Sequence, residues 1–132
     1  MQVCDISITT IADGEKTSFA CSGKMDASLQ NTRIFYQEEN ASVAVFFEKE
    51  TAMVVREGDY TLTLPLKRGE RTTGKLGIGG NEGDVELFAY KIEYSLRENS
   101  VFALLHYDLL LGGGKQEMKL RILAKARKEE NV

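Results

Sequence analysis

The chain contains very few of the residues that interrupt a strand or cross-link a fold. Its 132 residues include one proline, two cysteines, one histidine and no tryptophan. One histidine and two cysteines are too few for a structural zinc site, which uses four such ligands, and we expect no metal and no cofactor. Helical periodicity is also nearly absent, because apolar and polar residues alternate and turn residues recur roughly every eight to twelve positions.

The charge balance excludes a second group of functions. The formal net charge is −3, so the chain lacks the basic excess that is typical of nucleic-acid binding. The longest apolar run, Val101–Leu111, is too short to cross a membrane as a helix. The first residues lack the basic and apolar regions of a signal peptide. We therefore expect one cytoplasmic domain over residues 1–132, with a frayed charged tail at 127–132 and with no nucleic-acid or membrane partner.

The alternation predicts an all-β fold in which a meander of strands runs along the whole chain. The predicted strands are Val3–Ala12, Glu15–Met25, Thr32–Glu38, Ala41–Glu48, Ala52–Glu57, Tyr60–Leu66, Arg71–Ile78, Val85–Ser95, Val101–Leu111 and Lys115–Ala126. A meander exposes two edges unless the sheet closes. We predict an antiparallel up-and-down barrel of about eight to ten strands, of the calycin or lipocalin kind. A sandwich of two sheets is the alternative.

The first hairpin places the two cysteines. Asp13-Gly14 is a strong signal for a two-residue turn. This turn sets Cys4 opposite Gly23 and Cys21 opposite Ile6, so the two thiols share a face but lie diagonally. Their Cα atoms are then about 7–8 Å apart, beyond comfortable disulfide reach. We expect two buried free thiols.

The other turns predict further registers. Gly58-Asp59 pairs Val55 with Leu62, and a four-residue loop pairs Leu96 with Val101, which sets Tyr90 opposite Tyr107. The last hairpin, across Gly113-Gly114, pairs Leu109 with Met118 and places Asp108 beside Lys119 on the outer face. Five glycines in Gly74–Gly83 indicate a weak strand, Arg71–Ile78, followed by a loop at the rim. This stretch lacks the ending of a phosphate-binding loop.

Three segments, taken in their order and spacing, resemble the YwiB-like bacterial family. They are Tyr36-Gln37-Glu38-Glu39, Arg56-Glu57-Gly58 and Tyr107–Gly113. The resemblance extends over almost the whole chain, from about Ile6 to Ala126. It implies a small calycin-like β-barrel, a bacterial cytoplasmic setting and no established activity. It provides no catalytic residues to transfer.

The single histidine, His106, is predicted on the outer face of its strand, opposite Arg121. Asp108 shares this face, but we interpret it as the partner of Lys119 in a cross-strand charge pair and not as part of a catalytic triad. No nucleophile and base, and no pair of carboxylates, are placed together by the pattern. We therefore interpret His106 as a surface histidine, assign no catalytic residue and expect no enzymatic activity.

Two hypotheses of function remain open. Aromatic residues predicted on inward faces suggest a small apolar or amphipathic ligand held inside the barrel; these residues are Phe19, Tyr36, Phe88, Tyr90, Tyr94 and Tyr107. Apolar residues predicted on the outer face suggest instead a homodimeric interaction protein with a filled core; these residues are Phe102, Leu104, Leu110 and Leu123.

Overall fold

A computed structural model describes residues 1–28 and 30–127. The described residues form ten strands, which close into one antiparallel barrel. The strands are β1 (Gln2–Ala12), β2 (Glu15–Ala27), β3 (Thr32–Glu38), β4 (Ala41–Phe47), β5 (Thr51–Gly58), β6 (Tyr60–Lys67), β7 (Arg71–Ile78), β8 (Asn81–Arg97), β9 (Ser100–Leu111) and β10 (Gly114–Ala126). The predicted all-β barrel is confirmed. Apart from Arg127, the tail predicted at 127–132 lies outside the described residues.

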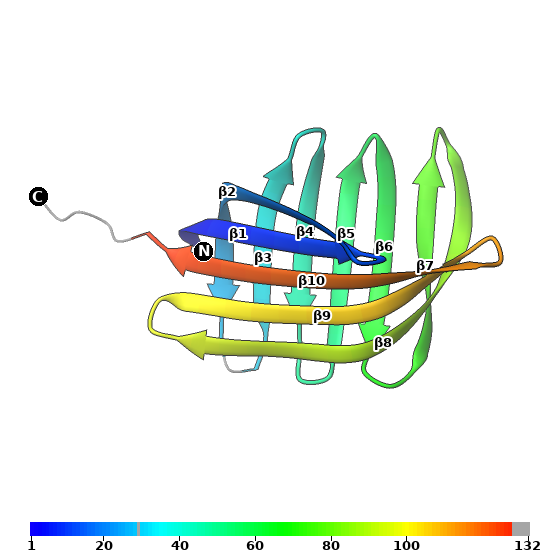
Figure 1. Cartoon of the computed structure of the whole chain (residues 1–132). Coiled ribbons are helices and arrows are strands. Elements are labelled where there is room, and N and C mark those ends of the chain that lie inside the picture. The colour runs from blue at the N-terminus through cyan, green and yellow to red at the C-terminus, as the bar shows by residue number, and fades with distance from the viewer. Residues whose placement is uncertain (29, 128–132) are drawn as a thin grey trace, which may run out of the picture.

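The barrel is flattened into two layers whose strands cross steeply (Figure 1). The front layer contains β1, β10, β9 and the second part of β8, and the back layer contains β3 to β7. β2 and β8 belong to both layers, because each pairs with the front layer along one part and with the back layer along the other. Every strand is therefore paired with a neighbour on each side along at least part of its length.

Two local features turn these long strands from one layer to the other. In β2 the turn is at Gly23, where a Cβ atom would lie 2.3 Å from the carbonyl oxygen of Phe35 and 2.4 Å from Cδ1 of Ile6. In β8 the register shifts between Ala89 and Lys91, so Tyr90 is the extra residue of a β-bulge. Close backbone approach and a bulge are two established ways to bend a strand at a barrel corner.

The space between the layers is filled by side chains that alternate along the strands. Phe47, Ile6, Leu105 and Ile122 each expose 1% of their surface. Side chains this inaccessible do not border a water-sized void, so the centre of the barrel is a packed core. Within the described residues the chain forms no helix with the length and hydrophobicity needed to cross a bilayer.

The structure corrects the predicted register of β5 with β6. Arg56, and not Val55, pairs with Leu62. A shift of one residue exchanges the two faces of a strand. Val54 is therefore buried in the core, whereas Met53 and Val55 lie on the outer face of the back layer.

The bulge in β8 changes the predicted pairing and orientation of a second set of residues. Ala89, and not Tyr90, pairs with Tyr107, while Ile92 pairs with Leu105 as predicted. The inward face of β8 before the bulge is Val85, Leu87 and Ala89, each almost fully buried. Phe88 and Tyr90, which were predicted to point inward, lie on the outer face.

The last hairpin turns at Gly112-Gly113 and not at Gly113-Gly114, as was predicted. Each residue of β9 therefore pairs two positions away from its predicted partner on β10. Both glycines have positive φ, 52° and 84°, as a tight two-residue turn requires. Tyr107 therefore pairs with Met118. A shift of two keeps each side chain on its predicted face but changes its neighbours.

Gly23→Ala should destabilise the protein by about 1–3 kcal/mol, because the new methyl group overlaps the backbone at the β2 corner. Gly83→Ala is the matched control, since nothing lies within 4 Å of a Cβ at that glycine of β8. Urea denaturation of both variants measures the difference. Equal stability of the two variants would show that the corner at Gly23 does not depend on the missing side chain.

Candidate functional site

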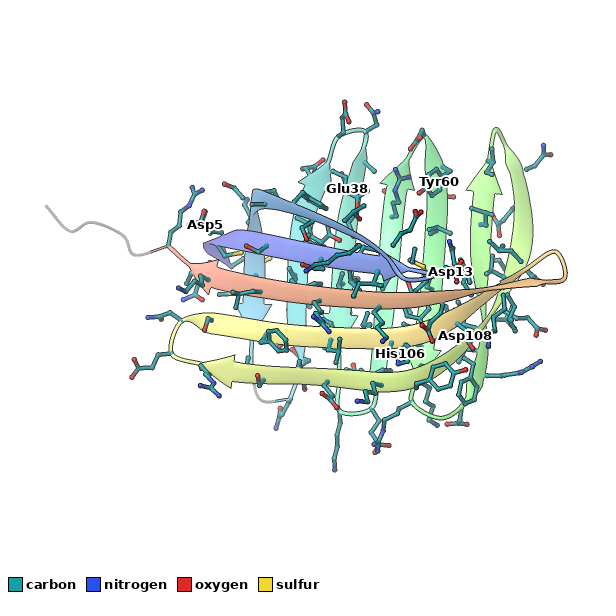
Figure 2. The ribbon with its side chains drawn as sticks, viewed as in Figure 1. Asp5, Asp13, Glu38, Tyr60, His106 and Asp108 are labelled. Atoms are coloured by element: carbon teal, nitrogen blue, oxygen red, sulfur yellow. The ribbon has the colours of Figure 1, made fainter. Side chains whose placement is uncertain are left out.

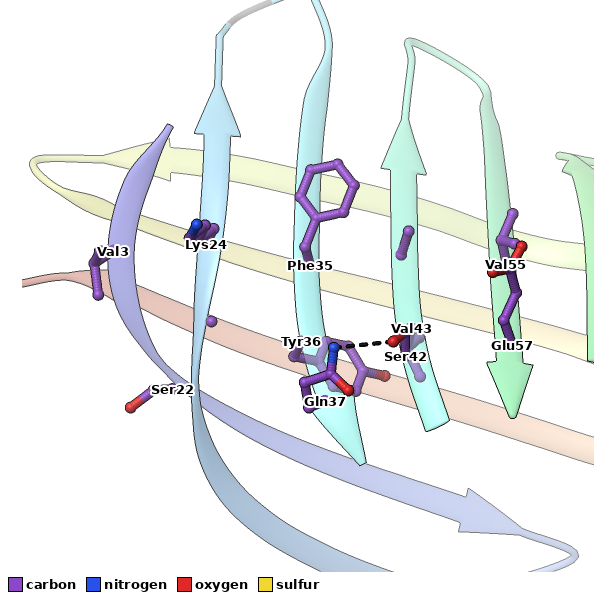
Figure 3. A pocket seen from close by; sticks show the side chains of 12 residues that line it. Val3, Ser22, Lys24, Phe35, Tyr36, Gln37, Ser42, Val43, Val55 and Glu57 are labelled. Carbon is purple, nitrogen blue, oxygen red and sulfur yellow. Dashed lines mark hydrogen bonds between the residues drawn. The ribbon is translucent and has the colours of Figure 1, made fainter. Parts of the chain in front are cut away.

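The candidate site is an open depression of about 600 Å³ on the outer face of β2 to β5. Its floor is a row of directly paired residues that crosses the strands. Lys24 pairs with Phe35, Phe35 with Ala44, and Ala44 with Val55. Each of them alternates with an inward residue of its own strand, so the row points away from the core. We call this depression the outer groove (Figure 3).

A second row along the outer groove is polar. Gln37 pairs with Ser42, and Ser42 pairs with Glu57. The Gln37 side-chain amide Nε2 donates a hydrogen bond of 2.9 Å to Oγ of Ser42, drawn as the dashed line in Figure 3. The outer groove therefore presents an apolar row beside a row of hydrogen-bonding groups.

Lys24 is the cation of the outer groove. It lies at the β2 end of the apolar row, beside its other cross-strand partner, Val3, which is 47% exposed. Within the described part of the chain, Lys24 takes part in none of the ion pairs. Its ammonium group is therefore available to an anion that enters the groove.

Arg56 forms a second polar centre, at the rim of the barrel. It donates hydrogen bonds to the Glu38 carboxylate (3.3 Å), the Tyr60 carbonyl oxygen (2.8 Å) and the Asp59 carboxylate (2.9 Å). Its guanidinium carbon also lies 3.7 Å from the centre of the Tyr60 ring. The bond from Arg56 lowers the pKa of Asp59. Arg56 is thus fully engaged in tying the β5–β6 turn to β3 and is not free to bind a ligand.

A third cluster lies at the bulge, on the outer face of the front layer (Figure 2). The Tyr90 hydroxyl donates a hydrogen bond to Oδ2 of Asp108, and this bond raises the pKa of Tyr90. Asp108 is only 4% exposed and its other oxygen, Oδ1, has no hydrogen-bond partner. The Tyr90 ring also lies 4.9 Å from the His106 ring, measured between centroids. Tyr90 covers the buried carboxylate and fixes the bulge.

The neighbours of this cluster differ from those predicted. His106 pairs with Lys119, not with Arg121, and its Nε2 lies 3.3 Å from the Glu117 carboxylate. The cation nearest to Asp108 is Lys115, at 3.6 Å, and not Lys119. Within the described residues, no group of three histidine, cysteine, aspartate or glutamate side chains is placed to hold a metal ion.

The six aromatic residues proposed as an interior ligand site separate into two sets. Tyr36 and Tyr107 are each 5% exposed in the core, and Tyr94 packs with its ring centroid 5.6 Å from that of Phe47. Burial raises the pKa of Tyr107 to about 12. Phe19 is on the inward side of β2 but is 39% exposed. Phe88 and Tyr90 are outside, as described above, so the six residues do not form one interior cluster.

The four residues proposed as an interface do point outward. Phe102 pairs directly with Leu123, and the two side chains are 48% and 40% exposed. Leu104 and Leu110 are partly buried on the same face of β9. The described outer face of the front layer therefore carries a compact apolar pair with the half-buried Leu104 beside it, whereas Leu110 lies at the other end of β9.

The two cysteines are free, as predicted. Cys4 pairs with Gly23 and Cys21 with Ile6, in the predicted register. Cys4 is buried, but Cys21 is only partly so, which corrects the prediction that both thiols are buried. Burial raises the pKa of both thiols, so neither is activated as a nucleophile.

The sequence and the fold can now be compared with known proteins. A family model described as a domain of unknown function, DUF1934, matches residues 2–122. The chain belongs to the DUF1934 family. The crystal structure of the YwiB protein of Bacillus subtilis is similar, with a TM-score of 0.83, 17% identity, and coverage of 96% of this chain and 93% of that chain. At this identity the likeness concerns the fold. None of the curated proteins matches the chain.

These matches confirm the resemblance to the YwiB-like family that was drawn from Tyr36–Glu39, Arg56–Gly58 and Tyr107–Gly113. The structure assigns physical roles to parts of all three motifs. Glu38 and Arg56 bind each other at the rim, and Gly112-Gly113 forms the last turn. These parts of the motifs mark the architecture of the barrel, whereas two other motif residues, Gln37 and Glu57, belong to the polar row of the outer groove.

Sequence reasoning missed the outer groove for a specific reason. The pattern placed Phe35 and Ala44 on an outer face that is partly apolar, but it placed Val55 in the core. The pairing of β4 with β5 sets Val55 opposite Ala44, which brings it into line with the other two. The signal in the sequence that could have revealed the groove was an apolar residue on the outer face of each of three neighbouring strands.

Tyr90→Phe should lower the free energy of unfolding, because the buried Asp108 carboxylate then loses its hydrogen-bond donor. Tyr60→Phe is the matched control, since its contact with Arg56 uses the ring and the backbone carbonyl. Urea denaturation at neutral pH compares the two variants. A loss in Tyr60→Phe as large as that in Tyr90→Phe would contradict the role given to the Tyr90 hydroxyl.

Proposed function

We propose that this protein is a non-enzymatic, cytoplasmic binding protein for a small anionic amphiphile, which occupies the outer groove. The observation that supports the proposal most directly is the row Lys24–Phe35–Ala44–Val55 across four paired strands. A row of one cation and three apolar side chains matches a ligand with an anionic head and an apolar tail.

The dimensions of the outer groove agree with a small molecule. Its volume of about 600 Å³ lies within the range found for ligand sites. The row from Lys24 to Val55 covers three spacings between neighbouring strands, or about 14 Å. This distance corresponds to the length of a medium-length alkyl chain. The polar row of Gln37, Ser42 and Glu57 runs beside the tail and offers hydrogen bonds to any polar group along the ligand.

The packed core is the reason why the ligand is assigned to the outside of the barrel. Tyr36 and Tyr107 are buried among aliphatic side chains in the interior. A ligand there would have to displace packed side chains, which costs several kcal/mol. A ligand in the outer groove instead covers apolar surface that is already exposed to water, which is favourable.

Decanoate is a suitable probe, because it combines a carboxylate with an unbranched apolar tail. Lys24→Gln should weaken its affinity about tenfold, since a charge-assisted contact is lost. The matched control is Lys16→Gln, which removes an exposed lysine of the same strand outside the groove. Titration followed by NMR chemical shifts gives both affinities and locates the shifts on β3 to β5.

Decylamine, with the same tail and the opposite charge, tests the polarity of the site. The proposal requires it to bind more weakly than decanoate. Equal binding of the two compounds, an unchanged affinity in Lys24→Gln, or the absence of any shift with decanoate would each contradict the proposal.

Homodimerisation is the second candidate function, and the exposed pair Phe102 and Leu123 supports it. If this pair forms the interface, the protein has a dimeric mass at micromolar concentration, and Leu123→Lys gives a monomer. Met53→Lys, a similarly exposed apolar position on the back layer, should leave the mass unchanged. Light scattering measures the mass, and a monomeric wild-type protein would exclude this interface.

A further inference from the structure

The outer face of the front layer gathers positive charge, although the whole chain has a net charge of −3. This face looks toward the viewer in Figure 2. Cross-strand pairing aligns its outward side chains in rows that run from β2 through β1, β10 and β9 to β8. Four successive rows hold six lysines and arginines, which are Lys16, Lys91, Arg97, Lys119, Arg121 and Lys125. We call these four rows the basic face.

Few acids oppose this charge. The basic face itself contains two carboxylates, Asp5 and Glu93, and Asp5 is bound by Arg127 at 2.7 Å. A third carboxylate, Glu117, lies in the next row and is 3.3 Å from Nε2 of His106. Among the residues that the structure describes, none of the ion pairs includes any of the six cations. Their charges are therefore available to an external anion.

One row of the basic face carries no charge. It runs Ala20–Ser7–Leu123–Phe102–Ser95, and its two large apolar side chains, Phe102 and Leu123, are 48% and 40% exposed. The row on one side of it holds Arg97 and Lys125, and the two rows on its other side hold the remaining four cations. The apolar pair thus stands between cations on both sides.

This arrangement matches the surface of an anionic bilayer. Proteins that bind such a surface bury apolar side chains at the level of the headgroups, while lysines and arginines contact the lipid phosphates. Neighbouring rows are about 7 Å apart along the strands and neighbouring strands about 5 Å apart. The six cations therefore cover an area of roughly 20 Å by 20 Å, wide enough to contact several lipid headgroups.

The same features disfavour two other occupants. A second copy of this chain, related by a two-fold axis, would place its own basic face against this one and bring like charges together. A single-stranded nucleic acid would match the charge, but its bases stack on successive aromatic side chains. The four rows present one exposed aromatic ring, that of Phe102.

We propose that the basic face docks on an anionic lipid bilayer, with Phe102 and Leu123 inserted among the headgroups and the six cations against the lipid phosphates. The expectation of no membrane partner rested on the net charge and on the length of the apolar run, and neither describes how charge is distributed over one face. The outer groove lies on the outside of the back layer, so the two proposals can fail separately. Docking competes with the homodimer for Phe102 and Leu123.

Vesicle flotation with the full chain tests the docking. Vesicles that contain equal parts of phosphatidylglycerol and phosphatidylcholine should bind the protein, and vesicles of phosphatidylcholine alone should bind it at least tenfold more weakly. Binding to the anionic vesicles should weaken as salt is added, because the charges are exposed and are screened.

Two substitutions of exposed cations locate the charge contribution. Lys91→Gln combined with Arg121→Gln should weaken binding to the anionic vesicles about tenfold. The matched control is Arg33→Gln combined with Lys49→Gln, which removes the same charge from exposed positions outside the front layer and should leave binding unchanged.

A neutral substitution tests the apolar contribution. Phe102→Ser should weaken vesicle binding several-fold without a change in charge, whereas Met53→Ser, at a similarly exposed position on the back layer, should not. Equal binding to the two kinds of vesicle, or full affinity in the Lys91 and Arg121 double variant, would overturn the proposal. Absent vesicle binding would also overturn it, and a dimeric mass or binding of a labelled oligouridylate would then assign the face to a second copy or to RNA.

Discussion

Closure of the sheet at two bends is the constraint on which this structure depends. Ten strands close into a barrel only if the first and the last strand pair with each other. Two layers that cross steeply can be joined only where strands bend. Gly23 gives β2 its bend by having no side chain where the Phe35 carbonyl and Ile6 approach. The bulge at Tyr90 gives β8 its bend by inserting one residue. The hydrogen bond from Tyr90 to the covered carboxylate of Asp108 then holds that residue in place.

The surfaces of the barrel follow from the same bends. Because β2 leaves the back layer at Gly23, its first half continues the front layer beyond β1. On the other face of the back layer, β2 to β5 align Lys24, Phe35, Ala44 and Val55 in one row. The interior between the layers is filled. A barrel of this size with a packed core can only bind partners on its surfaces and edges, and these bends determine which ones are available.

The period-two pattern was sufficient to predict the strands, their antiparallel order and the closed barrel. It also gave two registers: Asp13-Gly14 placed Cys4 opposite Gly23, and the four-residue loop placed Leu96 opposite Val101. It was wrong at Val55 and at Tyr90, where a shift or an insertion of one residue exchanges faces. Both positions directly follow an apolar residue, Val54 and Ala89, so hydrophobicity alone did not distinguish the inward face from the outward one.

The sequence by itself determined the class of fold, the absence of a disulfide and the family, because these depend on alternation, turn chemistry and motif order along the chain. Only the tertiary structure decided that the core is filled, that Phe88 and Tyr90 lie outside, and that six cations from β2, β8 and β10 gather on one face. These features arise where strands from distant parts of the chain meet. Their geometry depends on the three-dimensional path of two bent strands, and no local pattern of residues encodes that path.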